Sequence, residues 1–183
     1  TTAKAVSAAS QSTVRVVFGA QNLSADVTGA DLDYFIARDW TLADGRLFTE
    51  SELRGGTNVC LIGQTVRTQF FGAGDPDGQA IRVGKMSCRV IGVLAAKGTS
   101  GFGLDQDNVV IMPLLTYQRR IAGDRDIDTI YVSAADGVAT ADVQEEIETI
   151  LRETRRIQPG ADDNFDVRDM TQIADAMASA TAT

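Results

Sequence analysis

The stretch Gly101–Pro113 constrains the fold more than any other part of the sequence. It reads Gly-Phe-Gly-Leu-Asp-Gln-Asp-Asn-Val-Val-Ile-Met-Pro. Its glycines and acidic residues are typical of a loop, the apolar run Val109–Met112 predicts a buried strand, and Pro113 suits the first turn of a helix. Within this short span the chain is therefore expected to turn, cross a core and begin a helix.

Length and charge narrow the class of protein. With 183 residues, of which 44% are apolar, the chain can bury a core as one large domain or two small ones. The 17 lysines and arginines against 25 acidic residues give a net charge of -8, with no basic run interleaved with aromatics. Phosphate backbones and anionic lipid therefore attract the chain little, which argues against nucleic-acid binding.

No apolar run approaches the roughly 20 residues that span a bilayer, and the start lacks the pattern of a signal peptide. Both ends, Thr1–Ser12 and Ala174–Thr183, consist almost wholly of alanine, serine and threonine. This composition predicts helical stalks or linkers at the borders of a piece of a larger protein.

Histidine is absent, so the commonest general base and metal ligand is missing. Cys60 and Cys88 are the two cysteines, too few for a structural zinc site, and each lies in an apolar, strand-like run. Two interpretations stay open: buried free thiols that pack as small hydrophobic groups, or a disulfide between neighbouring strands in an oxidising compartment.

Periodicity and turn residues predict alternating short strands and helices, with a turn at Gly19–Ser24 and a hairpin connection at Gly84–Met86. In the strand near residue 130, Ile130 and Val132 are expected to face inward. The predicted strands are Val14–Phe18, a partner that ends near Val27, Asn58–Ile62, Gln79–Val83, Cys88–Leu94, Val109–Met112, Ile127–Ser133 and Asn164–Arg168. The predicted helices begin near Asp31, at the Thr49–Glu52 capping box, before Val66, after Pro113 as far as Gly123, at Thr140 as far as Arg156, and at the Asp169–Gln172 capping box.

The helix expected at Thr140–Arg156 has the clearest amphipathic pattern. Acidic residues lie at its start and arginines at its end, which matches the helix dipole. Its apolar stripe, spaced at helical intervals, consists of Val143, Ile147, Ile150, Leu151 and Thr154.

The order of elements predicts an α+β fold with a split subdomain. Residues 1–43 and 127–183 have a similar strand and helix pattern, and each is too small to close a core alone. Residues 44–126 have their own strands and glycine-rich turns. We therefore predict one α/β subdomain built from both ends, with a second mixed α/β subdomain inserted between them.

Two stretches resemble nucleotide- or metal-binding motifs, but their residue types and spacing do not fit. In Gly78–Met86 five residues separate the glycines where a phosphate-binding loop needs four, and Met86 replaces the magnesium-binding hydroxyl. Asp124, Asp126 and Asp128 begin like a calcium loop, but the later glycine and glutamate are missing. No cofactor or metal site is predicted.

Asp105 and Asp107 are the candidates for an acid–base pair. Two residues apart in an extended chain, they would share a face and could divide hydrolytic roles between them. The alternative is that they cap turns by binding the local backbone, as their position beside glycines suggests. Ser100 and Ser133 have no histidine to activate them, so no nucleophile is predicted and catalysis is not expected.

Several short motifs follow one another along the chain: Tyr34-Phe35, Trp40, Gly45–Thr49, Val59–Gly63, Asp75–Gln79, Arg89–Val93, Gly101–Pro113 and Thr116. In this order and spacing they resemble the periplasmic core domain of MacB-type (MacB/FtsX-like) ABC transporter permeases. The resemblance extends from Val14 to about Met170. It departs from the family pattern at Asp77, where an apolar residue is usual, and at Gln79, where lysine is common.

The resemblance implies a non-catalytic extracytoplasmic domain of an inner-membrane permease, with membrane segments on both sides of it. The split subdomain would be the porter-like one. ATP would be hydrolysed by a separate cytoplasmic domain or subunit, and the domain would transmit that motion outward. The implied partners are a second permease subunit, that ATPase and a periplasmic membrane-fusion adaptor; the membrane is reached only through flanking segments.

The glycine-rich loop Ala95–Gly103 is the candidate presenting surface, expected to be mobile on a stiff core. Phe102 is either exposed there or folded back into the core. Two other functions stay open: a stand-alone periplasmic ligand- or protein-binding module, and a carboxylate-dependent hydrolase that uses Asp105 and Asp107. The predicted partner-contact residues are Thr99, Gly101, Phe102, Gly103 and Leu104.

Overall fold

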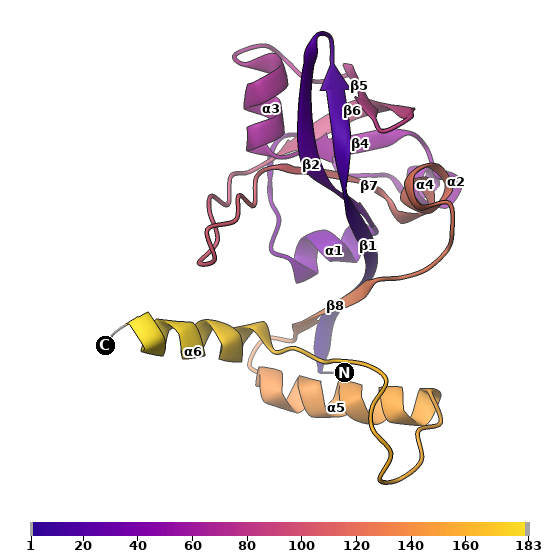
Figure 1. The fold of residues 1–183 in the computed structure, drawn as a ribbon, viewed down its shortest axis with the longest axis vertical. Helices are drawn as coiled ribbons and strands as arrows, with labels where there is room; N and C mark the ends of the chain where they lie inside the picture. The colour runs from indigo at the N-terminus through magenta and orange to yellow at the C-terminus, as the bar shows by residue number, and fades with distance from the viewer. Residues whose placement is uncertain (1, 182–183) are drawn as a thin grey trace. The chain divides into compact units, whose positions relative to one another are not determined.

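A computed structural model describes residues 2–181 and combines helices with strands (Figure 1), which confirms the predicted α+β class. The strands are β1 (Ala3–Phe18), β2 (Gln21–Ala30), β3 (Leu42–Gly45), β4 (Val59–Ile62), β5 (Ala80–Val83), β6 (Met86–Leu94), β7 (Val109–Pro113) and β8 (Thr129–Ala134). The helices are α1 (Leu32–Ala37), α2 (Glu50–Gly55), α3 (Gln64–Phe71), α4 (Leu114–Tyr117), the π-helical turn η1 (Gln118–Ala122), α5 (Thr140–Thr154) and α6 (Met170–Thr181).

All eight strands belong to one mixed sheet in the order β2-β7-β4-β6-β5-β1-β8, with β3 beside β6. The pairs β2–β7 and β4–β6 are parallel. Strand β1 also pairs with β2 along Ser10–Phe18, so that the two form a long hairpin (Figure 1). Because β1 contacts both β2 and β5, the strand order closes on itself.

The sheet separates two apolar clusters. Successive residues of β4 point to opposite faces, so Cys60 and Ile62 pack in one cluster and Leu61 packs in the other. The first cluster also contains Val90 and is covered by α3, whereas the second includes the aromatic ring of Phe35 from α1. Strands buried on both faces explain the continuous apolar runs in the sequence.

The chain forms two compact units. We call Ala5–Val132 the core unit, and the residues up to Lys4 together with those from Ser133 onward the terminal unit. Strands from both sides of the predicted border at residues 43 and 44 share the one sheet. The division into porter-like and inserted subdomains stays a prediction.

The prediction of a stalk or linker at Thr1–Ser12 is wrong over the described residues, because β1 begins at Ala3. Alternate residues Ala5, Ser7 and Ala9 are buried, with exposed fractions of 4%, 0% and 2%. Small side chains therefore face the protein at every second position, and Ser7 Oγ donates a hydrogen bond to Asp31 Oδ1. This period of two was hidden because alanine and serine do not stand out as core residues.

Two predicted strands need correction. Strand β8 is displaced to Thr129–Ala134, and Ile130 is 58% exposed rather than inward. Tyr131 contacts the protein instead, with its ring 5.4 Å from that of Tyr34. A shift of one residue moves every side chain of a strand to the other face.

The predicted strand Asn164–Arg168 is irregular in the structure. Side-chain contacts shape it: Arg155 donates to the side-chain and backbone oxygens of Asn164, and Arg168 pairs with Asp166. The predicted turn at Gly19–Ser24 is also shorter than expected, since β2 resumes at Gln21.

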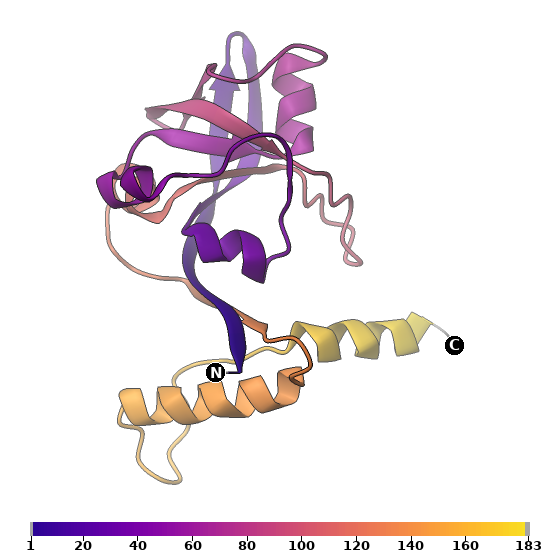
Figure 2. The ribbon, with the colours of Figure 1, turned by 180° about the vertical axis from the view of Figure 1, so that it is seen from behind.

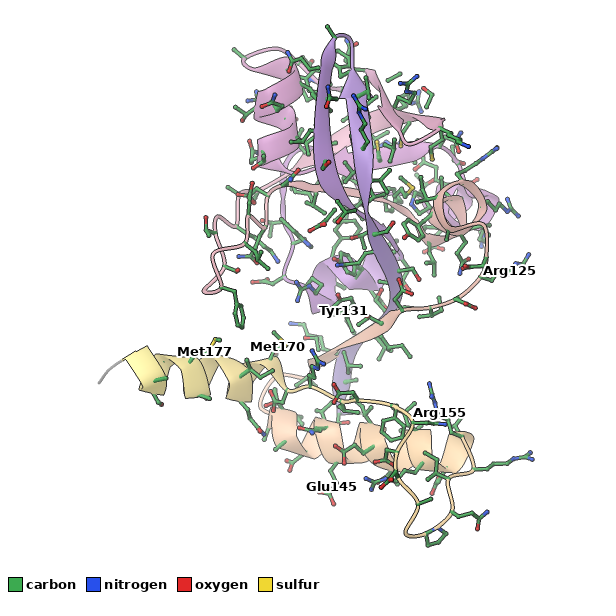
Figure 3. All side chains as sticks on the ribbon, viewed as in Figure 1. Arg125, Tyr131, Glu145, Arg155, Met170 and Met177 are labelled. Carbon is green, nitrogen blue, oxygen red and sulfur yellow. The ribbon has the colours of Figure 1, made fainter. Side chains whose placement is uncertain are left out.

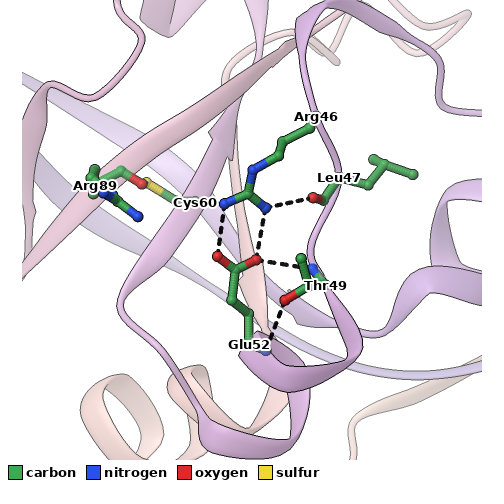
Figure 4. Close-up of polar contacts among 6 residues, drawn as sticks. All are labelled: Arg46, Leu47, Thr49, Glu52, Cys60 and Arg89. Carbon is green, nitrogen blue, oxygen red and sulfur yellow. Dashed lines mark hydrogen bonds and ion pairs between the residues drawn. The ribbon is translucent and has the colours of Figure 1, made fainter.

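The predicted capping box at Thr49–Glu52 is present. The Thr49 hydroxyl accepts from Glu52 N–H, while the Glu52 carboxylate accepts from Thr49 N–H and pairs with Arg46 in a two-bond ion pair (Figure 4). The hydrogen bonds from Arg46 lower the pKa of Glu52 to about 2. Downstream, the helix after Pro113 ends at Gly123, which has a φ of 79°.

Other predicted elements are also present. The connection between β5 and β6 is the predicted tight hairpin, and α5 covers most of the predicted Thr140–Arg156 helix. The predicted last helix is α6, although the end of the Ala174–Thr183 segment lies outside the described residues. Of the α5 stripe, Val143 is buried but Ile150 is 52% exposed.

Both cysteines are buried free thiols in the first apolar cluster. Burial raises the pKa of the Cys60 thiol well above its ordinary value, and the neighbouring Cys88 adds to this shift. In this structure they pack as small hydrophobic groups.

Candidate functional site

The candidate site is the loop between β6 and β7, which projects from the core unit (Figure 2). All five predicted partner-contact residues, from Thr99 to Leu104, lie on it. Phe102 is 59% exposed and Leu104 is 68% exposed, so Phe102 does not fold back into the core. Two large apolar side chains are therefore presented to solvent close together in the chain.

The tip of this loop is a narrow turn closed by backbone contacts. Thr99 forms an antiparallel bridge with Asp105, and Ser100 N–H donates to the carbonyl oxygen of Leu104 at 2.8 Å. Gly103 N–H donates back to Ser100, and its φ of 77° favours glycine at this position. Phe102 is held at the end of this turn.

The Asp107 carboxylate fixes the base of the loop. It is 7% exposed and accepts hydrogen bonds from the backbone N–H groups of Lys97 at 2.7 Å and Gly98 at 2.9 Å. A buried carboxylate that accepts backbone N–H groups is satisfied without a cation partner. Asp107 therefore joins the two sides of the loop where it leaves the sheet.

Asp105 extends this support toward α3. Its carboxylate accepts from Asp107 N–H at 2.9 Å and from the Thr65 hydroxyl at 2.7 Å. Close backbone packing adds to the contact, because a Cβ at Gly63 would lie 2.1 Å from the carbonyl oxygen of Asp107. These bonds support the turn-capping interpretation of the two aspartates, and they occupy the oxygens that an acid–base pair would need.

A cavity of about 420 Å³ lies beside the base of the loop. Lys97 Nζ is 4.0 Å from the centre of the Trp40 ring and donates to the carbonyl oxygen of Arg38. Burial lowers the pKa of Lys97, and nearby Arg38 lowers it further. The lining residues are Asp39, Trp40, Thr41, Ala95, Ala96, Lys97 and Gln106.

Sequence reasoning missed this cavity and the role of Lys97 in it. The sheet brings Thr41 and Ala95 together, as Ala95 N–H donates to the carbonyl oxygen of Thr41. The residues that line the cavity come from two separate segments of the sequence, and neither segment has a motif that predicts a cavity. Trp40 was the one feature that could have indicated it.

Within residues 2–181, no cluster of three or more acidic or cysteine side chains could hold a metal ion. The carboxylates that begin like a calcium loop bind backbone groups: Asp124 accepts from Asp126 N–H and Asp128 from Gln11 N–H. The described helices include none long and apolar enough to cross a membrane.

Comparison with known proteins gives the family of this domain. Residues 1–150 match the model of the MacB-like periplasmic core domain, so the chain belongs to this domain family of ABC transporter permeases. A relative from Chlorobium phaeobacteroides, a macrolide export ATP-binding/permease protein MacB, is 36% identical over 92% of this chain. The relative of that name from Chlorobium luteolum is 33% identical over the same share. The chain spans about a quarter of the length of these two relatives.

Solved structures have the same fold. The periplasmic region of MacB from Actinobacillus actinomycetemcomitans matches 97% of this chain and 77% of that one, with a TM-score of 0.79 at 21% identity. The extracellular domain of the noncanonic ABC-type transporter YknZ from Gram-positive bacteria matches 86% of this chain and 79% of that one, with a TM-score of 0.71 at 18% identity.

Proposed function

We propose that this chain is the non-catalytic extracytoplasmic domain of a MacB-type permease, and that it transmits ATP-driven motion to cargo or to a periplasmic adaptor. Family membership supports the setting, because the curated relatives are named as ATP-binding/permease proteins. The proposed partners are a second permease subunit, a cytoplasmic ATPase domain or subunit, and the adaptor. The proposed location is the periplasmic side of an inner membrane.

The observation that carries this proposal is an exposed apolar tip on a fixed base. Displacement passes through a body only if the contact point is held firmly to it. At the base of the loop, Asp107 accepts from the backbone N–H groups of Lys97 and Gly98, and Asp105 accepts from Asp107 N–H. At its tip, Phe102 and Leu104 stay exposed. The contact surface in our proposal comprises Thr99, Gly101, Phe102, Gly103 and Leu104.

The test uses the full-length permease and its co-encoded adaptor. We expect the double substitution Phe102→Ser and Leu104→Ser to reduce capture of the adaptor by about tenfold, because two exposed apolar anchors are lost. ATP hydrolysis in the absence of adaptor should not change. The matched control is Ile36→Ser with Ile130→Ser, which removes two apolar side chains of similar exposure elsewhere in the core unit.

Adaptor capture that is unchanged by the loop variant, or reduced equally by the control, would contradict the proposed contact surface. Loss of basal ATP hydrolysis would contradict a role restricted to contact. Thermal unfolding of each variant shows whether the fold is retained.

A ligand-binding module is the second candidate, and the cavity beside Trp40 and Lys97 favours it. Ala96 lines the cavity, so Ala96→Trp should fill much of it without altering the loop tip. A binding module would then lose cargo binding while adaptor capture persists. Transmission through the loop predicts that both are retained.

A further inference from the structure

Three exposed arginines, Arg15, Arg82 and Arg89, come from three neighbouring strands of the core unit. They lie on β1, β5 and β6, on the outer side of the first apolar cluster. Arg15 is far from the other two in the sequence, so the three arginines do not form a basic run. Strand pairing in the sheet places them on one surface.

Strand register places Arg15 and Arg82 on one face. Val17 of β1 is the partner of Arg82 on β5, and paired residues of antiparallel strands point to the same side. Arg15 is two residues from Val17 and therefore also points to that side. Its carbonyl oxygen accepts from Gly84 N–H at 2.9 Å, which confirms the alignment of the two strands.

The same reasoning adds Arg89. Arg82 is paired with Ser87 of β6, and Ala80 is paired with Arg89. Arg89 is therefore the diagonal neighbour of Arg82, as Arg82 is of Arg15. Diagonal neighbours in a sheet are about 7–8 Å apart, so the arginines form an evenly spaced row across the three strands.

The positive charges of this row are not neutralised by ion pairs among the described residues. None of the three arginines forms an ion pair with any residue between 2 and 181. Lys85 adds a further positive charge in the turn between β5 and β6. Asp26 on β2 is the partner of Thr13 and accepts a hydrogen bond from its hydroxyl, and Glu52 is paired with Arg46. Within the part of the chain that the structure describes, the three arginines of the row are therefore unpaired positive charges in a chain with a net charge of -8.

We propose that this arginine row is a docking surface for an acidic segment of a partner protein that lies in extended conformation across β1, β5 and β6. Alternate side chains of an extended chain are spaced by about 6.6–6.8 Å, which matches the spacing of the row. Val17 and Ser87, the strand partners of Arg82, and Ala80, the partner of Arg89, have short side chains that let a backbone approach the row. Carboxylates would pair with guanidinium groups that lack a partner within the described residues. This proposal does not depend on the loop between β6 and β7.

The experiment uses a fluorescent peptide of about ten residues with glutamate at every second position. We expect the triple variant R15Q/R82Q/R89Q to bind it about tenfold more weakly than the unchanged protein, measured by fluorescence anisotropy at low salt. The control R54Q/R120Q/R125Q removes the same charge from exposed positions of α2, η1 and the following loop (Figure 3 labels Arg125), and should bind within about twofold of the unchanged protein.

Equal weakening by the control would show attraction by net charge alone and would overturn the proposal. So would a peptide of the same composition with its glutamates in one run binding as tightly as the alternating one. Binding to vesicles that contain phosphatidylglycerol, without binding to the peptide, would assign the row to a lipid surface instead. Absence of binding to either probe also overturns the proposal, provided that thermal unfolding shows the protein to be folded.

Discussion

The core unit and the terminal unit are stabilised in different ways. Among the described residues, every buried apolar side chain except Val143 belongs to the core unit. In the terminal unit Ile150 and Met170 are more than half exposed, and the contacts are largely polar, such as the Arg152–Asp163 ion pair at 2.7 Å. Charge differs as well, with 11 acidic and five basic residues in the terminal unit against 14 and 12 in the core unit.

This difference indicates which part can act as a rigid body. Burial of apolar surface is the dominant favourable contribution to folding, whereas exposed ion pairs contribute little. The core unit therefore has its own source of stability, and the loop with Phe102 is attached to that unit.

Truncation in the core should have the greatest effect. Leu61 lies on β4 and is 0% exposed. Leu61→Ala should therefore lower the free energy of unfolding by about 2–5 kcal/mol. Ile150→Ala on α5 is the matched change in the terminal unit and should cost less than about 0.5 kcal/mol, since Ile150 is already 52% exposed. Urea denaturation measures both. A similar loss of unfolding free energy in both variants would contradict the difference in stability between the two units.

A second comparison concerns the base and the tip of the loop. Gly63→Ala should destabilise the protein by about 1–3 kcal/mol, because the new Cβ would meet the backbone of Asp107. Gly101→Ala should change stability little, as no heavy atom lies within 4 Å of a Cβ there. Thermal unfolding reports both values. A tip that is as sensitive as the base would show that the loop is not anchored as described.

The elements of the core unit that could be predicted from the sequence are those set by a few neighbouring residues. The apolar run Val109–Met112, the capping box at Thr49 and the glycine stop after η1 each act over a few residues, and each was found. The arginine row was missed because strand pairing, not chain proximity, brings Arg15 to Arg82. The hydrogen bonds of Asp107 were foreseen only as turn capping, since their donors are about ten residues away.

Two terminal segments were mispredicted because their local patterns were misleading. Alanine and serine bury little surface, so the strand from Ala3 had no apolar pattern to reveal it. Asn164–Arg168 alternates in polarity like a strand but is not paired with any described strand. Local pattern alone could not separate these two cases.

Acid should weaken the core unit through Glu52. Its pKa of about 2 lies below the ordinary value of 4.5, so the stabilisation from Arg46 and Thr49 is present above pH 4.5 and is lost as the pH falls toward 2. We expect Glu52→Gln to remove about 1–2 kcal/mol at neutral pH, a value reduced for solvent screening. Denaturation curves at several pH values test this. Glu50→Gln on the same helix serves as the control, and an equal loss there would contradict a specific role for Glu52.

The smallest effect is expected in the terminal unit. Arg152→Gln removes the ion pair with Asp163, but both groups are accessible to water. The melting temperature of the protein should therefore not change measurably, and added salt should not alter that result. A clear decrease would mean that polar contacts stabilise the terminal unit more than its exposure suggests.

Native-state hydrogen exchange can compare the stability of the two units residue by residue. We expect amides of β4, β6 and β7 to exchange only through global unfolding, and those of α5 and α6 to exchange through much smaller openings. The amides of Lys97 and Gly98, which donate to Asp107, should be protected, while those of Gly101 and Phe102 at the tip exchange fast. Equal protection of α5 and β4, or an unprotected Lys97 amide, would contradict a firm core unit that presents an anchored loop.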